Sequence, residues 1–70
     1  MSEIIIRITD DFIRLDTLLK LAGITETGGQ AKFIIQNGEV KLNGEVCKMR
    51  GKKVYPGDFA EYGSQTVKAE

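Results

Sequence analysis

Two stretches of this chain carry residue types suited to holding phosphate groups. Residues 48–53 are rich in cations and contain no acid. The cations of this segment are Lys48, Arg50, Lys52 and Lys53. Gly28 and Gly29 follow Thr27 at the expected start of a helix, where exposed N–H groups and the helix dipole favour an anion. Both stretches therefore predict contacts to the phosphates of an anionic polymer.

Each stretch also has a plainer interpretation. A surface lysine is most often a solvated charge, but four cations without an acid in six residues favour a binding role. A glycine pair in the first turn of a helix can reflect close packing or the geometry of the preceding loop. The sequence leaves the phosphate and packing interpretations of Gly28 and Gly29 equally open.

The formal charge of the chain is zero, with 10 basic and 10 acidic residues, but the charges are segregated. Residues 20–53 hold seven basic and three acidic residues, which leaves +4 there and −4 on the two ends together. Lys20, Lys32 and Lys41 are the other cations of this segment. Such segregation allows a basic face on a neutral protein.

Phe33 is an unusual residue for its position. It lies roughly 160° around the expected helix from the apolar stripe formed by Ala31, Ile34 and Ile35, on the side of Lys32. An exposed aromatic ring there could stack on an RNA base. Alternatively, it could pack on the sheet or contact a partner protein, since exposed aromatic residues also mark protein contacts.

The composition argues against catalysis. The chain has no histidine, so the usual triads and the commonest general base are missing. Cys47 is the only cysteine, which excludes an intrachain disulfide and a thiolate zinc site. No phosphate-binding loop of the G-x-x-x-x-G-K-[ST] type is present, and the chain is too short to enclose a carboxylate pair in a cleft. We expect neither an enzyme nor a cofactor or metal.

Length and hydropathy predict one domain over residues 1–70. Hydrophobic residues make up 41% of the 70 residues, which suffices for a core and is too much for a disordered tail. No apolar run is long enough to span a bilayer and no leader pattern opens the chain. A cytoplasmic protein without membrane partners is the simplest expectation.

Residues 3–9 read as a strand, and residues 14–23 follow as a helix with one apolar face. We expect Asp16 to cap this helix and Gly23 to end it. A second helix begins at Thr27, which forms a capping box with Gln30, and Asn37-Gly38 ends it.

Four short strands complete the predicted layout. Residues 40–42 and 45–47 flank Asn43-Gly44, which is the strongest local signal for a type I′ hairpin. Pro56-Gly57 predicts a type II turn, and residues 59–62 and 65–68 read as strands. The order β-α-α-β-β-β-β predicts an α+β fold with a helix pair on a small, mostly antiparallel sheet.

A set of residues from position 14 to position 58 resembles the RNA-binding domain named after small-subunit ribosomal protein S-four, also called the alpha-L motif. The matching residues are Arg14-Leu15-Asp16, Leu19, Ala22-Gly23, Ala31-Lys32, Ile35, Gly38, Val40-Lys41-Leu42-Asn43-Gly44, Val54 and Pro56-Gly57-Asp58. The helix start at residues 26–32 and the basic turn at residues 50–53 are similar to those of small stand-alone bacterial members, the YbcJ-like or YaaA-like proteins.

The resemblance implies that the helix pair and hairpin grip structured RNA, such as ribosomal or transfer RNA, with ribosomal proteins as further partners. In larger relatives the domain is attached to pseudouridine synthases or a tRNA synthetase, and no such catalytic part is found here. Arg14, Lys32 and Lys41 match the family pattern, whereas Thr27-Gly28 replaces its usual Ser-Arg pair. We expect the turn at residues 48–53 to supply the missing charge, and Asn43-Gly44 to be conformational.

Two other functions remain open at the level of sequence. A β-grasp protein-interaction or carrier domain shares the Asn-Gly hairpin, but sulfur carriers end in Gly-Gly, whereas this chain ends in Ala69-Glu70. A helix pair before the hairpin also disfavours the β-grasp fold. The third function is an assembly factor that uses Phe33 as a protein anchor.

Overall fold

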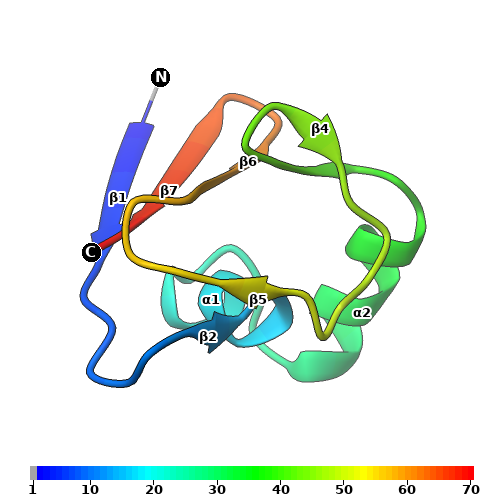
Figure 1. The fold of residues 1–70 in the computed structure, drawn as a ribbon. Helices are drawn as coiled ribbons and strands as arrows, with labels where there is room; N and C mark the ends of the chain where they lie inside the picture. The colour runs from blue at the N-terminus through cyan, green and yellow to red at the C-terminus, as the bar shows by residue number, and fades with distance from the viewer. Residues whose placement is uncertain (1) are drawn as a thin grey trace.

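The computed structural model describes residues 2–70, in which a curved sheet lies over a layer of helices and a short ribbon (Figure 1). The elements in chain order are β1 (Ser2–Ile6), β2 (Ile13–Arg14), α1 (Leu15–Leu21), α2 (Gly28–Gln36), β3 (Val40–Leu42), β4 (Glu45–Val46), β5 (Lys53–Val54), β6 (Phe59–Tyr62) and β7 (Gln65–Ala69).

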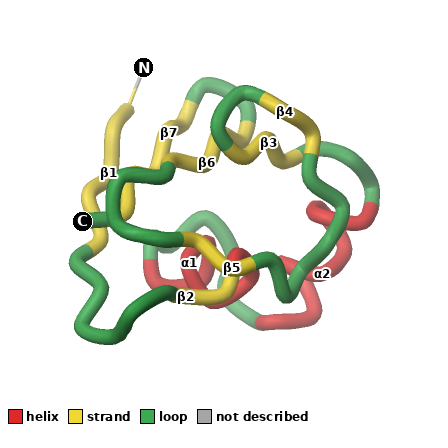
Figure 2. Tube along the Cα trace, in the orientation of Figure 1, coloured by secondary structure: helices red, strands yellow, loops and turns green. Residues whose placement is uncertain are grey.

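The strands form two sheets (Figure 2). The larger has the order β1-β7-β6-β3-β4, with β1 parallel to β7 and the remaining pairs antiparallel. The smaller is an antiparallel ribbon of β2 and β5 beside α1. The predicted α+β architecture, with a helix pair on a mostly antiparallel sheet, is confirmed.

The core lies between the large sheet and the helices. Both predicted apolar stripes are buried, with Leu15, Leu18 and Leu19 of α1 fully enclosed. Ala31, Ile34, Ile35, Val40, Leu42, Val54, Ala60, Val67 and Ala69 complete the buried cluster. Burial alternates along β3, so its middle residue points away from the helices. Helices this short depend on such packing because isolated helices of their length are unstable in water.

The turn predictions are confirmed by backbone geometry. Asn43 and Gly44 have φ angles of 53° and 88°, as a type I′ turn requires. Gly57 has a φ of 100°, and the Asp58 N–H donates to the Tyr55 carbonyl at 2.9 Å, which defines the type II turn. Gly23 also adopts the left-handed conformation after α1, as expected.

The predicted cap of α1 is wrong. The N-cap is Arg14, which makes no side-chain capping bond. Asp16 is already helical, and its Oδ1 accepts from the Thr17 N–H at 2.8 Å. The helix begins early because the chain enters it directly from β2. Its first N–H groups find other acceptors: Leu15 N–H donates to the Lys52 carbonyl at 2.9 Å, and Asp16 N–H donates to the Arg50 carbonyl at 3.0 Å.

The strand boundaries differ from the prediction in several places. The first strand ends at Ile6 rather than at residue 9, although Ile8 N–H still donates to the Glu70 carbonyl. The hairpin strand β4 ends at Val46, one residue early. The segment expected as a loop over residues 48–53 ends in β5, which pairs with an unexpected strand, β2. Two-residue strands carry no periodic signal, so the sequence does not reveal them.

The turn at Asn43 gives a test of what fixes the hairpin. Its side chain donates to Asp58 Oδ1 at 3.2 Å and accepts from the Phe59 N–H at 3.1 Å. We expect Asn43→Ala to lower the free energy of unfolding by about 2 kcal/mol, because it removes these bonds and because alanine tolerates the left-handed conformation less well than asparagine. Urea unfolding measures the loss.

Asn43→Gly is the matched control, since it loses the same bonds without the steric cost. Its loss should be about 1 kcal/mol smaller than that of Asn43→Ala. Equal losses would show that the left-handed backbone costs nothing at this position.

Candidate functional site

The ribbon of β2 and β5 gathers cations that are far apart in the sequence. Arg14 lies directly opposite Lys53 in the register. The carbonyls of Arg50 and Lys52 accept the hydrogen bonds from the start of α1 described above, which ties their backbone to the same place. We call Arg14, Arg50, Lys52 and Lys53 the basic cluster.

The guanidinium group of Arg14 lies against the loop of the basic cluster. A Cβ placed on Gly51 would lie 3.7 Å from Arg14 Nη2, so the guanidinium packs beside this glycine. The same nitrogen forms an ion pair with Asp16 Oδ2 at 3.1 Å. Arg14 nevertheless keeps 53% of its side chain exposed, so it can still reach a ligand.

Two aromatic rings support the other side of the cluster. The Lys53 ammonium lies 4.8 Å from the centre of the Phe12 ring, within the range of a cation–π interaction. The Phe12 and Tyr55 rings are tilted against each other with centres 6.0 Å apart. The ammonium group of Lys53 is thus positioned by the Phe12 ring and not by a carboxylate. Its positive charge is therefore not neutralised.

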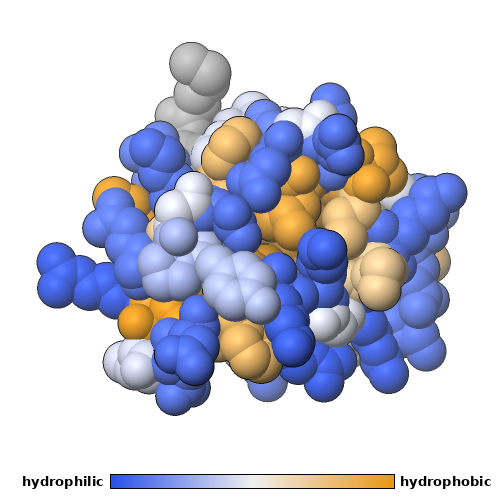
Figure 3. Space-filling model, viewed as in Figure 1, coloured by the Kyte–Doolittle hydropathy of each residue, from blue (hydrophilic) through white to orange (hydrophobic). Residues whose placement is uncertain are grey.

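The cluster is short of counter-charges. In residues 2–70 the ion pairs are those of Arg14 with Asp16 and of Lys68 with Glu3. Arg50, Lys52 and Lys53 therefore have no carboxylate partner in the described chain. Figure 3 shows the face that carries β5, where hydrophilic side chains surround smaller apolar areas.

Lys48 extends the cluster toward the end of α2. Its Cε would lie 3.4 Å from a Cβ placed on Gly38, just after the helix. Lys48 and Lys52 also line one shallow depression of about 260 Å³, together with Cys47 and Met49. Cys47 is partly buried there, and it packs against the core, as expected of a small hydrophobic residue.

The start of α2 confirms the predicted capping. Thr27 Oγ1 accepts from the Gln30 N–H at 3.2 Å. The return bond differs from the standard box, because Gln30 Oε1 accepts from the N–H of Glu26, at 2.7 Å, and not from that of Thr27. The side chains of Thr27 and Gln30 thus satisfy two N–H groups, whereas those of Gly28 and Gly29 have no acceptor in residues 2–70.

The close-packing interpretation of the two glycines is wrong. A Cβ on Gly28 would meet nothing within 4 Å, and one on Gly29 would lie 3.8 Å from Thr27 Oγ1. Neither residue has a left-handed backbone. Packing and conformation therefore do not require glycine at either position.

The other predicted residues are more scattered. Lys20 is exposed on the last turn of α1, and Lys32 and Phe33 are exposed on α2, with 68% of Phe33 accessible. Lys41 lies on the sheet face that points away from the helices, opposite Glu61. The structure thus brings Arg14, Arg50, Lys52 and Lys53 together and leaves Lys41 on another side of the molecule.

Sequence reasoning missed the residues that position the cluster. Phe12 and Asp16 contact its cations, and Tyr55 packs against Phe12. None of the three was predicted to belong to the site. Phe12 stands two residues before Arg14, which is the spacing of side chains on one face of a strand. That signal becomes useful only once β2 is known.

The described chain contains no gathering of Cys, Asp and Glu side chains that could hold a metal ion. Among residues 2–70, neither helix is long and apolar enough to cross a membrane.

A scan against family models matches residues 6–70 to the S4 domain. The chain belongs to the S4 domain family. The resemblance seen in the sequence, to the domain also called the alpha-L motif, is thereby confirmed. The departure at Thr27-Gly28 is a variation within the family.

Individual proteins with similar sequences are consistent with this family. The chain is 41% identical over 56 residues to the probable ribosome maturation protein RlbA of Bacillus subtilis, covering 80% of this chain and 79% of that protein. It is 36% identical over 55 residues to the putative RNA-binding protein YbcJ of Escherichia coli, covering 79% of each.

The solution structure of Escherichia coli YbcJ is similar to that of this S4 domain. The TM-score is 0.69 at 30% identity, over 99% of this chain and 86% of that one. That structure is described as revealing an alpha-L motif involved in RNA binding. The likeness supports the two-helix fold and does not favour the β-grasp alternative.

The open surroundings of Gly28 and Gly29 give a stability test. We expect the double variant Gly28→Ala/Gly29→Ala to raise the free energy of unfolding by about 1 kcal/mol, because alanine restricts the unfolded chain and meets no obstacle in the folded one. The midpoint of thermal unfolding should rise by about 4–8 °C.

Gly23→Ala is the control, because its surroundings are equally open but its φ is 77°. This variant should destabilise the domain. A loss of stability in the Gly28 and Gly29 variant would contradict our account of that helix start.

Proposed function

We propose that this S4 domain is a non-enzymatic module that binds structured RNA through its phosphates. The observation that carries the proposal is the basic cluster, in which three of four cations have no carboxylate partner in residues 2–70. Exposed cations without local partners are suited to replacing the counterions of a polyanion. The names of the relatives describe RNA binding and ribosome maturation, which supports the same function.

The start of α2 supplies a second anion site in this proposal. The N–H groups of Gly28 and Gly29 have no hydrogen-bond acceptor in residues 2–70, and Lys32 follows one turn later. A helix N-terminus of this kind favours a phosphate through its N–H groups and its dipole. It would act in place of the family arginine that Thr27-Gly28 lacks.

Recognition would depend on the shape of the RNA more than on its sequence. The cluster consists of lysines and arginines on a short ribbon and a loop. These side chains can contact guanine as well as phosphate, but the cluster has no Asn, Gln or Glu side chain to read adenine or cytosine. Phosphate contacts position a protein on the nucleic acid but carry no sequence information directly. Paired RNA is in any case recognised chiefly by shape and backbone.

Ribosomal RNA is the class we favour, in the cytoplasm and with ribosomal proteins as neighbours. The support is the name of the Bacillus subtilis relative, a probable ribosome maturation protein. Transfer RNA is the other structured RNA to compare in a binding assay. The proposed interface also includes flanking contacts from Lys20, Lys48, Phe33 and Lys41. Of these, Lys41 lies on a different side of the molecule from the basic cluster.

The salt dependence of binding tests the phosphate contacts. If about five phosphates are neutralised, the logarithm of the affinity should fall with the logarithm of the salt concentration with a slope near −4. Filter binding of a ribosomal RNA fragment at several salt concentrations measures the slope. A slope near zero would contradict the proposal.

Charge reversal locates those contacts. We expect Lys52→Glu/Lys53→Glu to lower RNA affinity more than tenfold and to reduce the steepness of the salt slope by about 2. Lys68→Glu is the control, because Lys68 is a lysine of the large sheet outside the cluster that pairs with Glu3. The control should change affinity little, and an equal loss in both variants would point to net charge alone.

The glycines separate binding from stability. Gly28→Ala/Gly29→Ala should weaken RNA binding several-fold, because the new methyl groups stand where a phosphate must approach the N–H groups. The same variant is expected to be more stable, so a loss of affinity cannot be attributed to unfolding. Unchanged affinity would remove the α2 N-terminus from the proposed site.

A further inference from the structure

The outer face of the β2–β5 ribbon places two aromatic rings beside cations of the basic cluster. Phe12 stands two residues before Arg14, and Tyr55 stands two residues after Lys53. Residues two apart along a strand share a face. The contacts agree, because Phe12 touches both the Tyr55 ring and the Lys53 ammonium, whereas Val54 is buried in the core. We call the surface formed by Phe12, Arg14, Lys53 and Tyr55 the ribbon face.

Tyr55 is the ring of the ribbon face that is available to a ligand. Phe12 is partly buried and already contacts Lys53 and Tyr55, whereas Tyr55 keeps 47% of its surface exposed. The Tyr55 N–H donates to Asp58 Oδ2 at 2.9 Å, and the Tyr55 carbonyl accepts from the Asp58 N–H at 2.9 Å. The backbone that carries the ring is therefore fixed, which lowers the cost of stacking a flat group on it.

The cations beside this ring favour an anion. Arg14 and Lys53 lie directly opposite each other in the ribbon, and like charges in that arrangement repel. Lys53 has no carboxylate partner in residues 2–70, and the ion pair of Arg14 with Asp16 leaves half of the Arg14 side chain exposed. A phosphate at these two side chains would relieve their repulsion.

The charge reverses on the other side of Phe12. Asp10 and Asp11 directly precede this residue and are exposed, and they line one depression with it. A phosphate would be attracted on the cationic side of the rings and repelled on the acidic side. A nucleotide suits this change of charge when its neutral base lies on the exposed ring and its phosphate lies at the cations.

We propose that the ribbon face binds one unpaired nucleotide of the RNA, with its base stacked on Tyr55 and a phosphate held by Arg14 and Lys53. The proposal rests on RNA binding as the function of the domain. It adds that the RNA carries a single-stranded nucleotide next to the region bound by the basic cluster. Stacking on an aromatic ring tolerates any base, so it agrees with recognition that depends little on sequence.

A protein side chain fits the ribbon face less well. An apolar side chain stacked on Tyr55 would displace water from the neighbouring cations without giving them a counter-charge, which is costly. A nucleotide supplies the flat group and the anion in one covalent unit. The unneutralised cations therefore favour the nucleotide.

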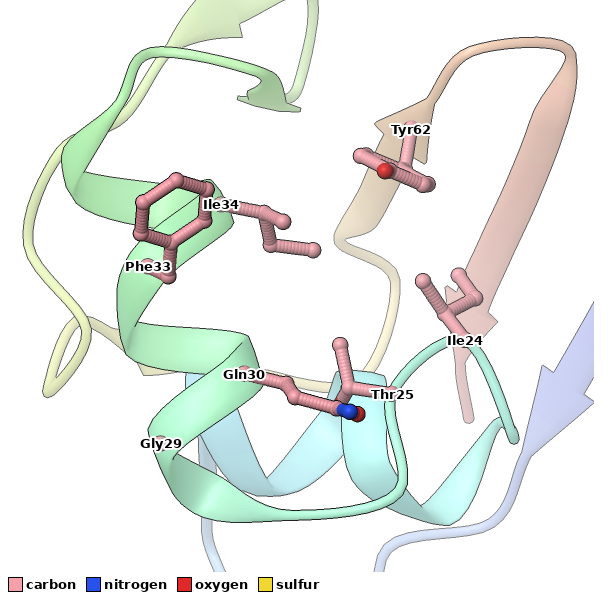
Figure 4. Close-up of a pocket in the computed structure, with 7 residues that line it drawn as sticks. All are labelled: Ile24, Thr25, Gly29, Gln30, Phe33, Ile34 and Tyr62. Atoms are coloured by element: carbon pink, nitrogen blue, oxygen red, sulfur yellow. The ribbon is translucent and has the colours of Figure 1, made fainter.

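The groove beside α2 lacks this selectivity. Its volume is about 400 Å³, and Figure 4 shows Phe33 and Tyr62 on opposite sides of it. No charged side chain of residues 2–70 lines this groove, so its exposed ring would accept an apolar side chain as readily as a base. The ribbon face differs because its ring adjoins cations.

Two RNA probes of equal charge test the proposal. One is a stem with a single-stranded loop of normal nucleotides, and the other is the same stem with abasic sites throughout the loop. We expect the wild-type protein to bind the probe with loop bases about tenfold more tightly, because the abasic probe offers no base to stack. Tyr55→Leu should remove this preference by weakening only the binding of the probe with loop bases.

Two further variants separate the base from the phosphate. Tyr55→Phe keeps the ring and should keep the preference for loop bases. Lys53→Gln removes a phosphate contact but keeps the ring, so it should weaken the binding of both probes by the same factor. If Tyr55→Leu fails to fold, crosslinking of the wild type decides: a loop that contains 4-thiouridine should crosslink to Tyr55 under ultraviolet light, as located by mass spectrometry, and a crosslink only elsewhere contradicts the proposal.

Three results would overturn the inference while leaving RNA binding intact. Equal binding of the two probes by the wild type would show that no base is held. Equal losses on both probes with Tyr55→Leu would show that the ring supports the fold or the phosphate contacts. A preference for loop bases that survives Tyr55→Leu would place the stacked base elsewhere and leave the ribbon face to an acidic protein segment.

A different result marks failure of the proposed function itself. If the wild type binds neither probe nor a ribosomal RNA fragment, RNA binding is wrong, and the inference fails with it.

Discussion

The structure depends on how the first turn of α1 is satisfied. This helix has seven residues and no side-chain cap, so its leading N–H groups need acceptors from elsewhere. The carbonyls of Arg50 and Lys52 serve two of these N–H groups, Asp16 Oδ1 serves that of Thr17, and β2 pairs with β5 at the same point. A segment more than thirty residues later in the chain thus completes the helix.

This arrangement couples the fold to the proposed binding surface. The carbonyls of Arg50 and Lys52 accept hydrogen bonds from the start of α1. These bonds fix the backbone of the segment, and its long cationic side chains reach solvent. Arg14 adds its charge from β2, the strand that leads into the helix. Phe12, which directly precedes β2, contacts the ammonium group of Lys53 through its ring. Bringing these cations together costs little while they are solvated and screened by salt, and the same charges become attractive once a polyanion replaces the counterions.

Sequence reasoning succeeded where the signal is local and failed where it depends on distant pairing. The hairpin at Asn43-Gly44, the type II turn at Pro56-Gly57 and the capping by Thr27 each depend on a few adjacent residues, and each is confirmed. The ribbon of β2 and β5 has two residues in each strand, too few for a period. Asp16 looked like a cap because nothing in its own neighbourhood reveals that another loop already occupies the helix start.

The costs that the fold tolerates are concentrated around the start of α2. Two glycines stand in its first turn without a steric need, and Thr25 nearby holds a buried hydroxyl without a partner in residues 2–70. Elsewhere the chain pairs its polar turn residues and places glycine where the backbone is left-handed. Asn43 forms hydrogen bonds with both Asp58 and Phe59, and the left-handed turns at Gly23 and Gly57 carry glycine. A domain of 70 residues has only a small core to offset such costs. Because a ligand that binds only the folded state stabilises it, a phosphate bound at the start of α2 would recover part of the stability that the free domain lacks there.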